Sequence, residues 1–352
     1  MTRTVVKSAR IETIKTPLKR PFITSLGRRD ATVNVGLTLR LQGGAEGYGE
    51  ASTSLALKNL TAKALEGALK RLCARAKGRD GRNSRALIDE AWAKEGKFSP
   101  AVAAFEAALL SALAAEAGLS LATWFGGALK SLKTDLTLSA WEDARMTEEA
   151  AVEAAQAGFE TLKIKVGGKF HDDLSRIEAV RRGAPKARLI LDGNQGLSPR
   201  GALKLLEAAR KTGAKIDIFE QPVCKDDLRG MAFLVKRAGI PVAADESAAT
   251  PEQAARVLQA GAATALNIKL AKSGLMKSLE MAALARASGA ALMIGCMAET
   301  SRGLAASVHF ALGTGFFRFV DLDSDVLLDE PASAKASAGW KRQGPIVTLA
   351  AL

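Results

Sequence analysis

The sequence has few of the residues from which many common sites are built. Its three cysteines, Cys73, Cys224 and Cys296, lie far apart, and its two histidines, His171 and His309, stand in unrelated contexts. No CxxC pair or Cys/His cluster is present, which argues against a zinc site and for reduced thiols in a cytoplasmic protein. Isolated imidazoles also argue against a histidine-based mechanism.

Long hydrophobic runs and dense basic tracts are missing as well. The most apolar segment, AVAAFEAALLSALAAEAGLSLA, is interrupted by Glu106 and Glu116 and suits a buried helix better than a membrane span. The N-terminal segment lacks the apolar stretch of a secretory signal. The net charge is +13, but aromatic residues are only 5% of the chain, so we expect no nucleic-acid partner and no membrane. The positive charge favours anionic small molecules.

The first third of the chain predicts an antiparallel sheet followed by helices. Three β-rich runs cover residues 3–15, 31–44 and 45–53, and the Gly43-Gly44 pair is typical of a hairpin turn. Residues 56–118 change to a helical period, with Ser99 expected as the N-cap of a helix whose first residue is Pro100. This order predicts an α+β layer.

From about residue 130, β-rich runs alternate with alanine-rich helical segments. The runs are DLTLSA, TLKIKV, ARLILDGN, KIDIFEQP, PVAADES, ALNIKLA, ALMIGC and FRFVDLD. Eight parallel strands with seven helices between them predict a TIM-type barrel over about 200 residues. An open doubly wound sheet would give a similar alternation, and the repeat count alone does not separate the two.

Polar residues stand at or near the C-terminal ends of these strands. They are Lys163, Lys165, Asp192, Asn194, Glu220, Asp245, Glu246, Lys269, Asp321 and Asp323. Taken singly, each could be a helix cap, a turn former or a surface lysine. From Lys165 to Lys269, however, successive markers are 24 to 28 residues apart, in phase with one β-α repeat. Barrel enzymes assemble their sites at this end of the strands.

Three carboxylates on neighbouring strands predict a metal site. In a closed barrel, Asp192, Glu220 and Asp245 on strands three, four and five would converge on one sector. Carboxylates that are brought together and buried repel one another, and a divalent cation resolves the repulsion. All-oxygen ligation by few protein groups fits Mg²⁺.

The lysines predict proton transfer at carbon. Lys163 and Lys165 share one face of their strand, because side chains alternate, and Lys269 lies four strands away, across the ring. We expect Lys163, the metal and desolvation to lower the pKa of Lys165 toward the range that suits a general base. When the carboxylate of a substrate is bound to the metal, a nearby base can remove the proton from the adjacent carbon, and the metal stabilises the resulting enediolate. Two facing bases suggest racemisation or epimerisation, whereas elimination or cycloisomerisation needs only one.

The last strand carries Asp321 and Asp323 on one face, opposite the predicted metal. Such a pair attracts a cation, so a substrate with a carboxylate at one end and an ammonium at the other would span the pocket. A dipeptide has this layout. The alternative is a solvated turn, because DLDSDVLLDE continues acidic.

At these residues the chain resembles the enolase superfamily, specifically the muconate-lactonizing subgroup with its KxK motif. The stretches EGYGEAST, LKIKVG, LDGNQG, FEQP, ADES and NIKLAKSG follow in the order and spacing of that family. The DLD sequence at residues 321–323 is similar to the signature of dipeptide epimerases, of which the Ala-Glu epimerase is the best-known type.

The resemblance implies an α/β fold, a modified TIM barrel (β/α)7β with an N-terminal α+β capping domain. The implied boundaries are 1–118 for the capping domain, 119–328 for the catalytic barrel and 329–352 for a C-terminal segment that packs back on the cap. The loops around 21–30 and 51–54 would close the site. We also expect a homo-oligomer.

The resemblance also implies the site residues. Mg²⁺ would be bound by Asp192, Glu220 and Asp245, with Lys165 and Lys269 as acid/base catalysts and Lys163 assisting electrostatically. Asp321 and Asp323 would hold the α-ammonium of the dipeptide, and Thr24, Thr137, Cys296, Met297 and Ala298 would line the substrate site. The implied reaction inverts the α-carbon of the C-terminal residue of an L,L-dipeptide. For the Ala-Glu type, an arginine is expected near Gly27 to meet the side-chain carboxylate of the substrate. Arg28 and Arg29 are close by, but the sequence does not give the direction of either side chain, which leaves the side-chain preference open.

Other functions stay open from the sequence. Within the same subgroup, these are a cycloisomerase, an o-succinylbenzoate synthase or an N-succinylamino-acid racemase, none of which needs a cation site on the last strand. A Schiff-base aldolase barrel also buries a lysine. A non-enzymatic binding protein would rest on the net charge alone.

Overall fold

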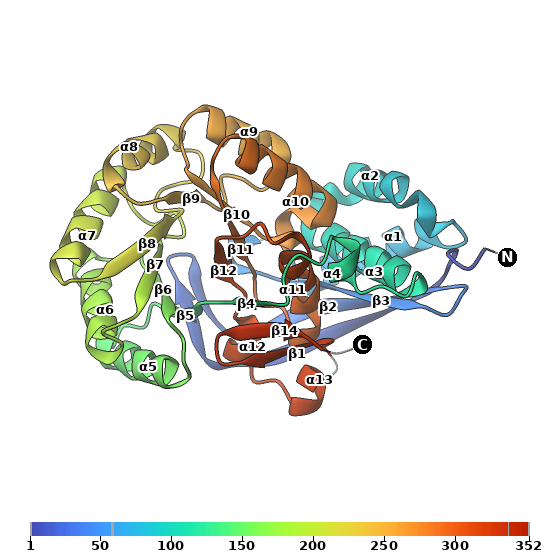
Figure 1. The fold of residues 1–352 in the computed structure, drawn as a ribbon, viewed down its shortest axis with the longest axis horizontal. Coiled ribbons are helices and arrows are strands. Elements are labelled where there is room, and N and C mark those ends of the chain that lie inside the picture. The colour runs from blue at the N-terminus through green and yellow to red at the C-terminus, as the bar shows by residue number, and fades with distance from the viewer. Residues whose placement is uncertain (1, 58–59, 337, 351–352) are drawn as a thin grey trace.

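The computed structural model describes residues 2–57, 60–336 and 338–350. Figure 1 shows a barrel with its ring of helices beside an N-terminal unit of long strands and helices. The predicted fold class is confirmed, because a parallel barrel and an antiparallel N-terminal sheet are both present.

The N-terminal unit contains an antiparallel sheet in the order β1-β2-β3. Its strands are β1 (Val6–Thr24), β2 (Gly27–Leu41) and β3 (Glu46–Ala51). The chain turns between β2 and β3 at residues 42–45, as the Gly43-Gly44 pair predicted, with Gly44 at a φ of 104°. β1 runs well beyond the predicted end at Lys15, because its pairing with β2 resumes at Phe22 after a register shift beyond Pro17.

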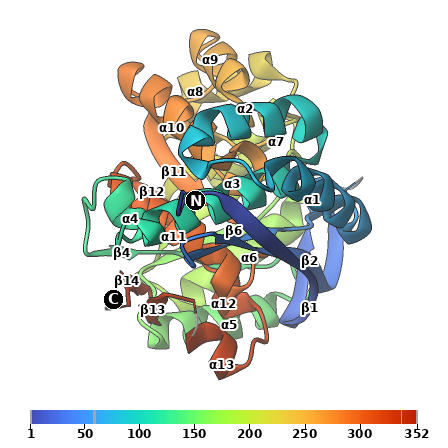
Figure 2. The ribbon, with the colours of Figure 1, turned by 90° about the vertical axis from the view of Figure 1, so that its right-hand side faces the viewer.

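Helices cover this sheet, and Figure 2 shows them from the side of the N-terminus. They are η1 (Leu55–Leu57), α1 (Ala62–Ala76), η2 (Gly81–Asn83), α2 (Ser84–Glu95), η3 (Gly96–Phe98), α3 (Ser99–Glu116) and α4 (Leu121–Trp124). The predicted start of α3 was one residue late, because Ser99 is already helical and Phe98 stands at the N-cap. α3 packs against β3, where a Cβ on Gly47 or Gly49 would collide with the backbone of the helix.

The apolar run predicted as a buried helix is α3. By length and composition the stretch Gly81–Glu116 could cross a membrane, but 78% of its apolar window is buried inside the protein. Glu106, in the middle of α3, accepts a hydrogen bond from the backbone N–H of Met276 (2.6 Å). α10 (Leu270–Ala287) is kinked at Gly274, where φ is 67°, and the bond satisfies one of the backbone N–H groups at the start of the helical segment that follows the kink. Burial raises the pKa of Glu106 to about 7.

The second sheet in the described chain has eight parallel strands in sequential order. They are β5 (Leu136–Leu138), β6 (Thr161–Lys165), β7 (Arg188–Asp192), β8 (Lys215–Glu220), β9 (Val242–Ala244), β10 (Ala265–Ile268), β11 (Ala291–Gly295) and β12 (Phe319–Asp321). The helices between them are α5 (Ala144–Gln156), α6 (Phe170–Gly183), α7 (Pro199–Lys211), α8 (Leu228–Ala238), α9 (Pro251–Gln259), α10 (Leu270–Ala287) and α11 (Ser301–Thr314).

The ends of this sheet meet, so it is a barrel and not an open sheet. The backbone N–H of Asp135 donates to the carbonyl of Val320 (3.0 Å), and the N–H of Thr137 donates to the Asp323 carboxylate (2.6 Å). These bonds join the segment of β5 to that of β12. The open doubly wound alternative is therefore excluded.

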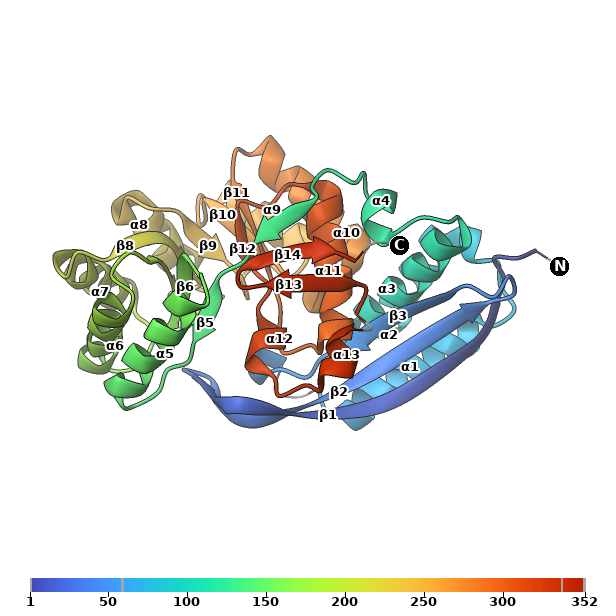
Figure 3. The ribbon, with the colours of Figure 1, turned by 60° about the horizontal axis from the view of Figure 1, so that its bottom comes forward.

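The C-terminal segment contains α12 (Ser324–Leu327), α13 (Ala332–Ala336), β13 (Trp340–Gln343) and β14 (Ile346–Leu349). Figure 3 shows β13 and β14 beside β4 (Ser131–Lys133), with which they form a third sheet. The segment touches β1 where the N–H of Asp329 donates to the carbonyl of Pro17 (2.9 Å). It also reaches α11, where Trp340 Nε1 donates to the carbonyl of Ser301 (2.8 Å). The domain boundaries drawn from the sequence stay predictions.

The strands of the barrel divide their side chains between two environments. On β6, Leu162 and Ile164 lie in the apolar cluster beneath the outer helices. Lys163 and Lys165 alternate with them and face the barrel interior, both buried. Below the lysines, the lower interior is filled by Ile190, Ile218, Ala243, Ala265 and Met293. The strand period predicted this division.

Candidate active site

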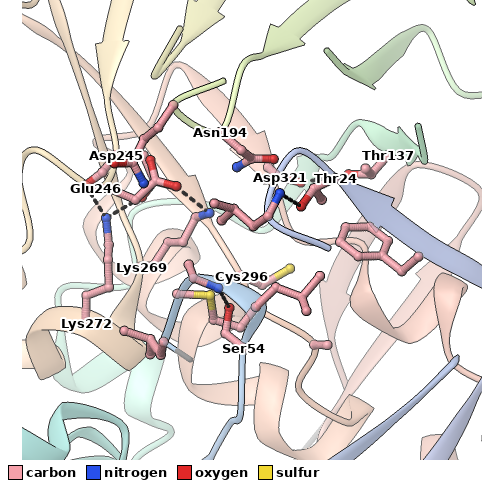
Figure 4. A pocket seen from close by; sticks show the side chains of 18 of the residues that line it. Thr24, Ser54, Thr137, Asn194, Asp245, Glu246, Lys269, Lys272, Cys296 and Asp321 are labelled. Carbon is pink, nitrogen blue, oxygen red and sulfur yellow. Dashed lines mark hydrogen bonds and ion pairs between the residues drawn. The ribbon is translucent and has the colours of Figure 1, made fainter. Parts of the chain in front are cut away.

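A cavity of about 430 Å³ opens at the C-terminal ends of the barrel strands. The barrel contributes Thr137, Lys165, Asn194, Asp245, Lys269, Cys296, Met297, Ala298, Asp321 and Asp323 to its wall. The N-terminal unit contributes Phe22, Thr24, Leu26, Arg29, Thr53 and Ser54, from the two loops expected to close the site. Figure 4 shows side chains from both units pointing into one space. Every residue predicted to contact substrate lies in this wall.

Lys163 lies under the floor of the cavity and joins two groups of carboxylates. Its Nζ is 3.0 Å from Asp192 Oδ2, 2.7 Å from Glu220 Oε2 and 2.7 Å from Asp321 Oδ2. The side chain is 1% exposed. Burial lowers its pKa, but the carboxylates of Asp192, Asp321 and Glu220 outweigh burial and hold that pKa well above the usual range.

Lys165 and Lys269 reach the cavity from β6 and from the end of β10, four strands apart in the ring. Lys165 Nζ donates to Asp192 Oδ2 (2.6 Å) and lies 5.7 Å from the centre of the Phe22 ring. Lys269 Nζ donates to Asp245 Oδ2 (2.8 Å). Burial opposes its charge, but Asp245 and Glu220 raise the pKa of Lys269. A lysine paired in this way is a proton donor, and it becomes a base only when its carboxylate partners are engaged elsewhere.

The three carboxylates predicted to bind metal are buried and charge-paired. Although burial raises the pKa of a carboxyl group, the nearby lysines hold the pKa of Asp192 and of Asp245 below its usual range. Burial and the neighbouring Asp192 raise the pKa of Glu220 to about 7. Glu220 Oε2 accepts no hydrogen bond of regular geometry from the described residues, although Lys163 is close. A cation could bind this oxygen once Lys163, whose Nζ is 2.7 Å away, is displaced.

The donor set therefore fits a hard divalent cation, but the lysines stand between the acids. Lys163 Nζ lies between Asp192 and Glu220, and Lys269 Nζ lies between Glu220 and Asp245 (3.7 and 2.8 Å). Binding of a cation would displace these ammonium groups and draw the carboxylates together. In the described chain, the acidic group whose oxygens already lie within 4.8 Å of one another is a different one, Asp135, Asp321 and Asp323.

Two residues beside the metal-site carboxylates were not predicted from the sequence. Lys272, in the first turn of α10, pairs with the Asp245 carboxylate and donates to the Asp245 carbonyl (2.7 Å). Asn267 Nδ2 donates to Glu220 Oε1 (2.7 Å). The signal for Lys272 was present in NIKLAKSG, where the i, i+3 spacing puts it one turn from Lys269.

Asp321 and Asp323 form the opposite wall and are 4% and 2% exposed, so the solvated-turn alternative is wrong. Thr137 donates through its N–H to Asp323 Oδ2 (2.6 Å) and through its hydroxyl to Asp321 Oδ1 (3.4 Å). Cys296 Sγ lies 3.8 Å from Asp323 Oδ1. Burial and the charge of Asp321 raise the pKa of Asp323 to about 6. Asp135, in contact with this pair, was not predicted.

The N-terminal unit holds the loop that follows β11. Asn34 Nδ2 on β2 donates to the Ala298 carbonyl (2.7 Å) and to Glu50 Oε1 (2.8 Å). Glu50 on β3 in turn accepts a hydrogen bond from the N–H of Thr300 (2.9 Å). The EGYGEAST motif therefore acts at the site through Glu50, which positions a loop of the cavity wall. Asn34 carried no signal in the sequence, because its partners lie far along the chain.

The two arginines near Gly27 point to different places. Arg29 lines the cavity and its Nη1 donates to the carbonyl (2.8 Å) and hydroxyl (3.1 Å) of Thr53. Arg28 is exposed and pairs with Asp30 (2.9 Å). Of the two, Arg29 is therefore the cation that borders the substrate space.

The sequence matches the enolase C-terminal domain-like family over residues 145–338. That range covers more than half of the chain and contains the predicted lysines and carboxylates. The chain belongs to this family. The membership predicted from the motifs is thereby confirmed.

Relatives of this enolase-family chain carry the name of epimerases. The L-Ala-D/L-Glu epimerase of Thermotoga maritima is 36% identical over 92% of this chain and 94% of the relative. The aromatic dipeptide epimerase of Herpetosiphon aurantiacus is 34% identical over 93% and 92%. A solved dipeptide epimerase from Enterococcus faecalis, complexed with Mg and L-Leu-L-Tyr, has a TM-score of 0.91 at 27% identity and covers 98% of this chain and 97% of that one.

Proposed function

We propose that this protein is a dipeptide epimerase that inverts the α-carbon of the C-terminal residue of an L,L-dipeptide. The observation that carries the proposal is the arrangement of two lysines and two aspartates around one cavity. Lys165 and Lys269 enter from strands four apart, and Asp321 and Asp323 form a buried acidic wall between β11 and β5. The names of the relatives support the same reaction.

Inversion at carbon requires that a proton leaves one face and returns to the other. In the proposed reaction, one of Lys165 and Lys269 is neutral and removes the α-proton, while the other is protonated and delivers a proton to the opposite face. For the reverse stereoisomer the two lysines exchange roles. Lys163 stays charged beside Asp321, to which its Nζ donates (2.7 Å), and adds positive charge near the negative charge that develops on the substrate.

The proposed cofactor is Mg²⁺, with Asp192, Glu220 and Asp245 as its protein ligands. When bound there, the ion supplies positive charge for the substrate carboxylate and makes the adjacent α-proton more acidic. Engagement of the carboxylates would also release Lys269 and Lys165 from their present partners. Mg in the complex of the Enterococcus faecalis relative supports this assignment.

At the other end of the substrate, Asp321 and Asp323 would accept the α-ammonium. An unpaired carboxylate in this position costs free energy, because burial penalises the charge, and a substrate cation removes that cost. A cycloisomerase, an o-succinylbenzoate synthase or an N-succinylamino-acid racemase has no use for such a pair. The acidic wall therefore favours a substrate with a free ammonium.

The test is hydrogen exchange in D₂O. The protein with Mg²⁺ is incubated with an L,L-dipeptide library, and deuterium at the C-terminal α-carbon and the D-configured product are measured. We expect both signals for a subset of dipeptides and neither signal for their N-acetylated forms. Absence of exchange with every dipeptide, or equal exchange with the N-acetylated forms, would contradict the proposal.

We also propose a cytoplasmic homo-oligomer. The three cysteines are free thiols, as a reducing compartment allows. Leu119, Trp124 and Leu129 are exposed on and around α4, and association would cover this apolar surface. Sedimentation of the purified protein tests the oligomer, because a monomer at all concentrations would contradict it.

A further inference from the structure

Asp135 is a buried carboxyl group to which the proposed reaction assigns no role. It immediately precedes β5 and lies two residues before Thr137, so both side chains face the barrel interior, Asp135 one layer deeper. Asp135 is 2% exposed and is not among the described residues that line the substrate cavity. It lines a second cavity of about 330 Å³, at the opposite end of the barrel, together with Thr161 and Ile190.

The donors around the three acids are distributed unevenly. Asp321 accepts hydrogen bonds from Lys163 Nζ and from the Thr137 hydroxyl, and Asp323 accepts one from the Thr137 N–H. Neither carboxyl oxygen of Asp135 accepts a hydrogen bond from an N–H or O–H group of the described residues. Its close neighbours are carboxylate oxygens, with one from each of the three acids within 4.8 Å of the others.

Asp135, Asp321 and Asp323 cannot all be ionised at once, with a total charge of −3. Three ionised carboxylates would share one ammonium, Lys163, which already serves Asp192 and Glu220. Like charges at this separation in a buried site repel strongly, so one of them takes up a proton. Asp135 gains most from a proton, because as a neutral acid it becomes a donor to oxygens that can accept. Burial and the charges of Asp321 and Asp323 raise the pKa of Asp135.

Resting on the proposed function, we infer that Asp135 is a positioning residue: it holds a proton and donates it in a hydrogen bond to Asp321. The proton stays on Asp135 throughout the reaction. Its presence orients the Asp321 carboxylate and limits the wall to two negative charges, Asp321 and Asp323, for one substrate ammonium and Lys163.

The other charged groups near Asp135 do not replace this proton. The charged residues around the second cavity are Lys133, Glu160, Arg188, Asp217 and Arg318. Lys133 pairs with Glu160 (2.8 Å), and Arg188 Nε donates to Asp217 (2.6 Å). The guanidinium of Arg318 lies 5.2 Å from the centre of the Phe319 ring. None of the described contacts brings these cations to the Asp135 carboxyl group.

The first experiment compares two substitutions in the full chain. Asp135→Asn keeps a donor of nearly the same shape, and Asp135→Leu removes it. We expect Asp135→Asn to keep the KM for a turned-over dipeptide within about threefold, and Asp135→Leu to raise KM about tenfold with a smaller change in kcat, the effect of one lost hydrogen bond to a charged group. Asp217→Asn, at the same cavity but paired with Arg188, is the matched control and should change neither. Equal damage by Asn and Leu would overturn the inference.

The second experiment detects the protonated carboxyl group of Asp135 and needs no substrate turnover. Infrared difference spectra of wild type minus Asp135→Asn at neutral pH should contain the carbonyl stretch of a neutral carboxylic acid, shifted in D₂O. Absence of this band would overturn the inference even if Asp135→Leu does not fold. If no dipeptide is turned over, the proposed function fails, while the band still decides where the proton lies. Loss of one equivalent of bound metal in Asp135→Asn would also overturn the inference, because the three acids would then hold a cation.

Discussion

Two sectors of the barrel each bring three buried acids together, and they differ in their cations. Asp192, Glu220 and Asp245, on neighbouring strands, have Lys163, Lys165, Lys269 and Lys272 among them. Asp135, Asp321 and Asp323, across the ring, have only Lys163 as an ion-pair partner among the described residues. The first sector is balanced by the protein itself. The second keeps negative charge that the protein does not neutralise.

The electrostatics follow from this difference. In the lysine-rich sector, ammonium groups hold the pKa of Asp192 and Asp245 below the usual range despite complete burial, although burial and Asp192 raise the pKa of Glu220. In the lysine-poor sector, burial and mutual repulsion raise the pKa of Asp135 and bring that of Asp323 to about 6, whereas Lys163 outweighs burial and lowers the pKa of Asp321. In the proposed function, a divalent cation would have to displace lysines in the first sector, whereas the ammonium group of the substrate would meet carboxylates that have one lysine among them.

The largest expected effect comes from breaking the lysine-rich sector at its bases. Lys165→Met or Lys269→Met should lower kcat by about 10²- to 10⁴-fold, the usual contribution of a general acid or base. Each variant should still exchange the α-proton of one stereoisomer in D₂O and lose exchange of the other. The exposed Lys130→Met serves as control and should keep full activity. If both variants lost exchange of the same stereoisomer, the two lysines would not serve opposite faces.

Removal of the divalent cation should have the next largest effect. Chelation should lower activity by roughly 10²- to 10³-fold, since charge stabilisation at the substrate carboxylate is lost, and Mg²⁺ should restore it. Mg²⁺ at about 100 times its Kd should also stabilise the fold by about 2.7 kcal/mol, seen as a rise in Tm. Glu220→Gln should abolish that rise. A Tm that responds to Mg²⁺ equally in Glu220→Gln would place the ion elsewhere.

In the lysine-poor sector, the expected effects are on the pH dependence of kcat/KM and on KM. Asp323 must be ionised to bind an ammonium, and its pKa is raised to about 6, so kcat/KM should fall as the pH drops through about 6. Folding has the opposite sign: the raised pKa favours the protonated folded state, and this contribution is lost as pH rises from about 4 through 6. Asp323→Asn should raise KM by about 10- to 100-fold and remove this limb of the profile. A limb that persists in Asp323→Asn belongs to another group.

The smallest effect should come from the contact that links the N-terminal unit to the acidic wall. Asn34→Ala removes the donor to the Ala298 carbonyl and one of the donors to the Glu50 carboxylate, which keeps that of Thr300, and should cost about 1–3 kcal/mol of stability. KM should rise a few-fold because the loop bearing Cys296, next to Asp323, loses its anchor. Asn83→Ala is the control, because Asn83 is exposed and makes no capping hydrogen bond. Equal losses in the two variants, measured by urea unfolding, would show that the anchor contributes nothing.

The sequence predicted those residues whose position along the repeat carries the information. Lys163 and Lys165 stand at alternate positions of one strand, and Asp192, Glu220 and Asp245 recur with the β-α period, so their convergence followed once the strands were placed in order.

Asp135 and Asn34 carried no such signal. In the sequence, Asp135 is the first residue of the β-rich run DLTLSA, and Asn34 is one polar position in the run at residues 31–44. The hydrogen bonds around them join residues that are distant in the chain: Thr137 and Asp321 are 184 positions apart, and Asn34 and Ala298 are 264 apart. No local pattern reports a contact over such a distance.

By itself the sequence determined the alternation of strands and helices, the side of each strand that bears charge, and the family to which the chain belongs. These depend on local periodicity, which every residue carries with it. The closure of β5 against β12, the sharing of Lys163 between two acid groups and the attachment of the 296–300 loop to Glu50 were decided by the tertiary structure. Each of these balances charges or hydrogen bonds between segments far apart in the chain, and only the folded arrangement determines which charges meet.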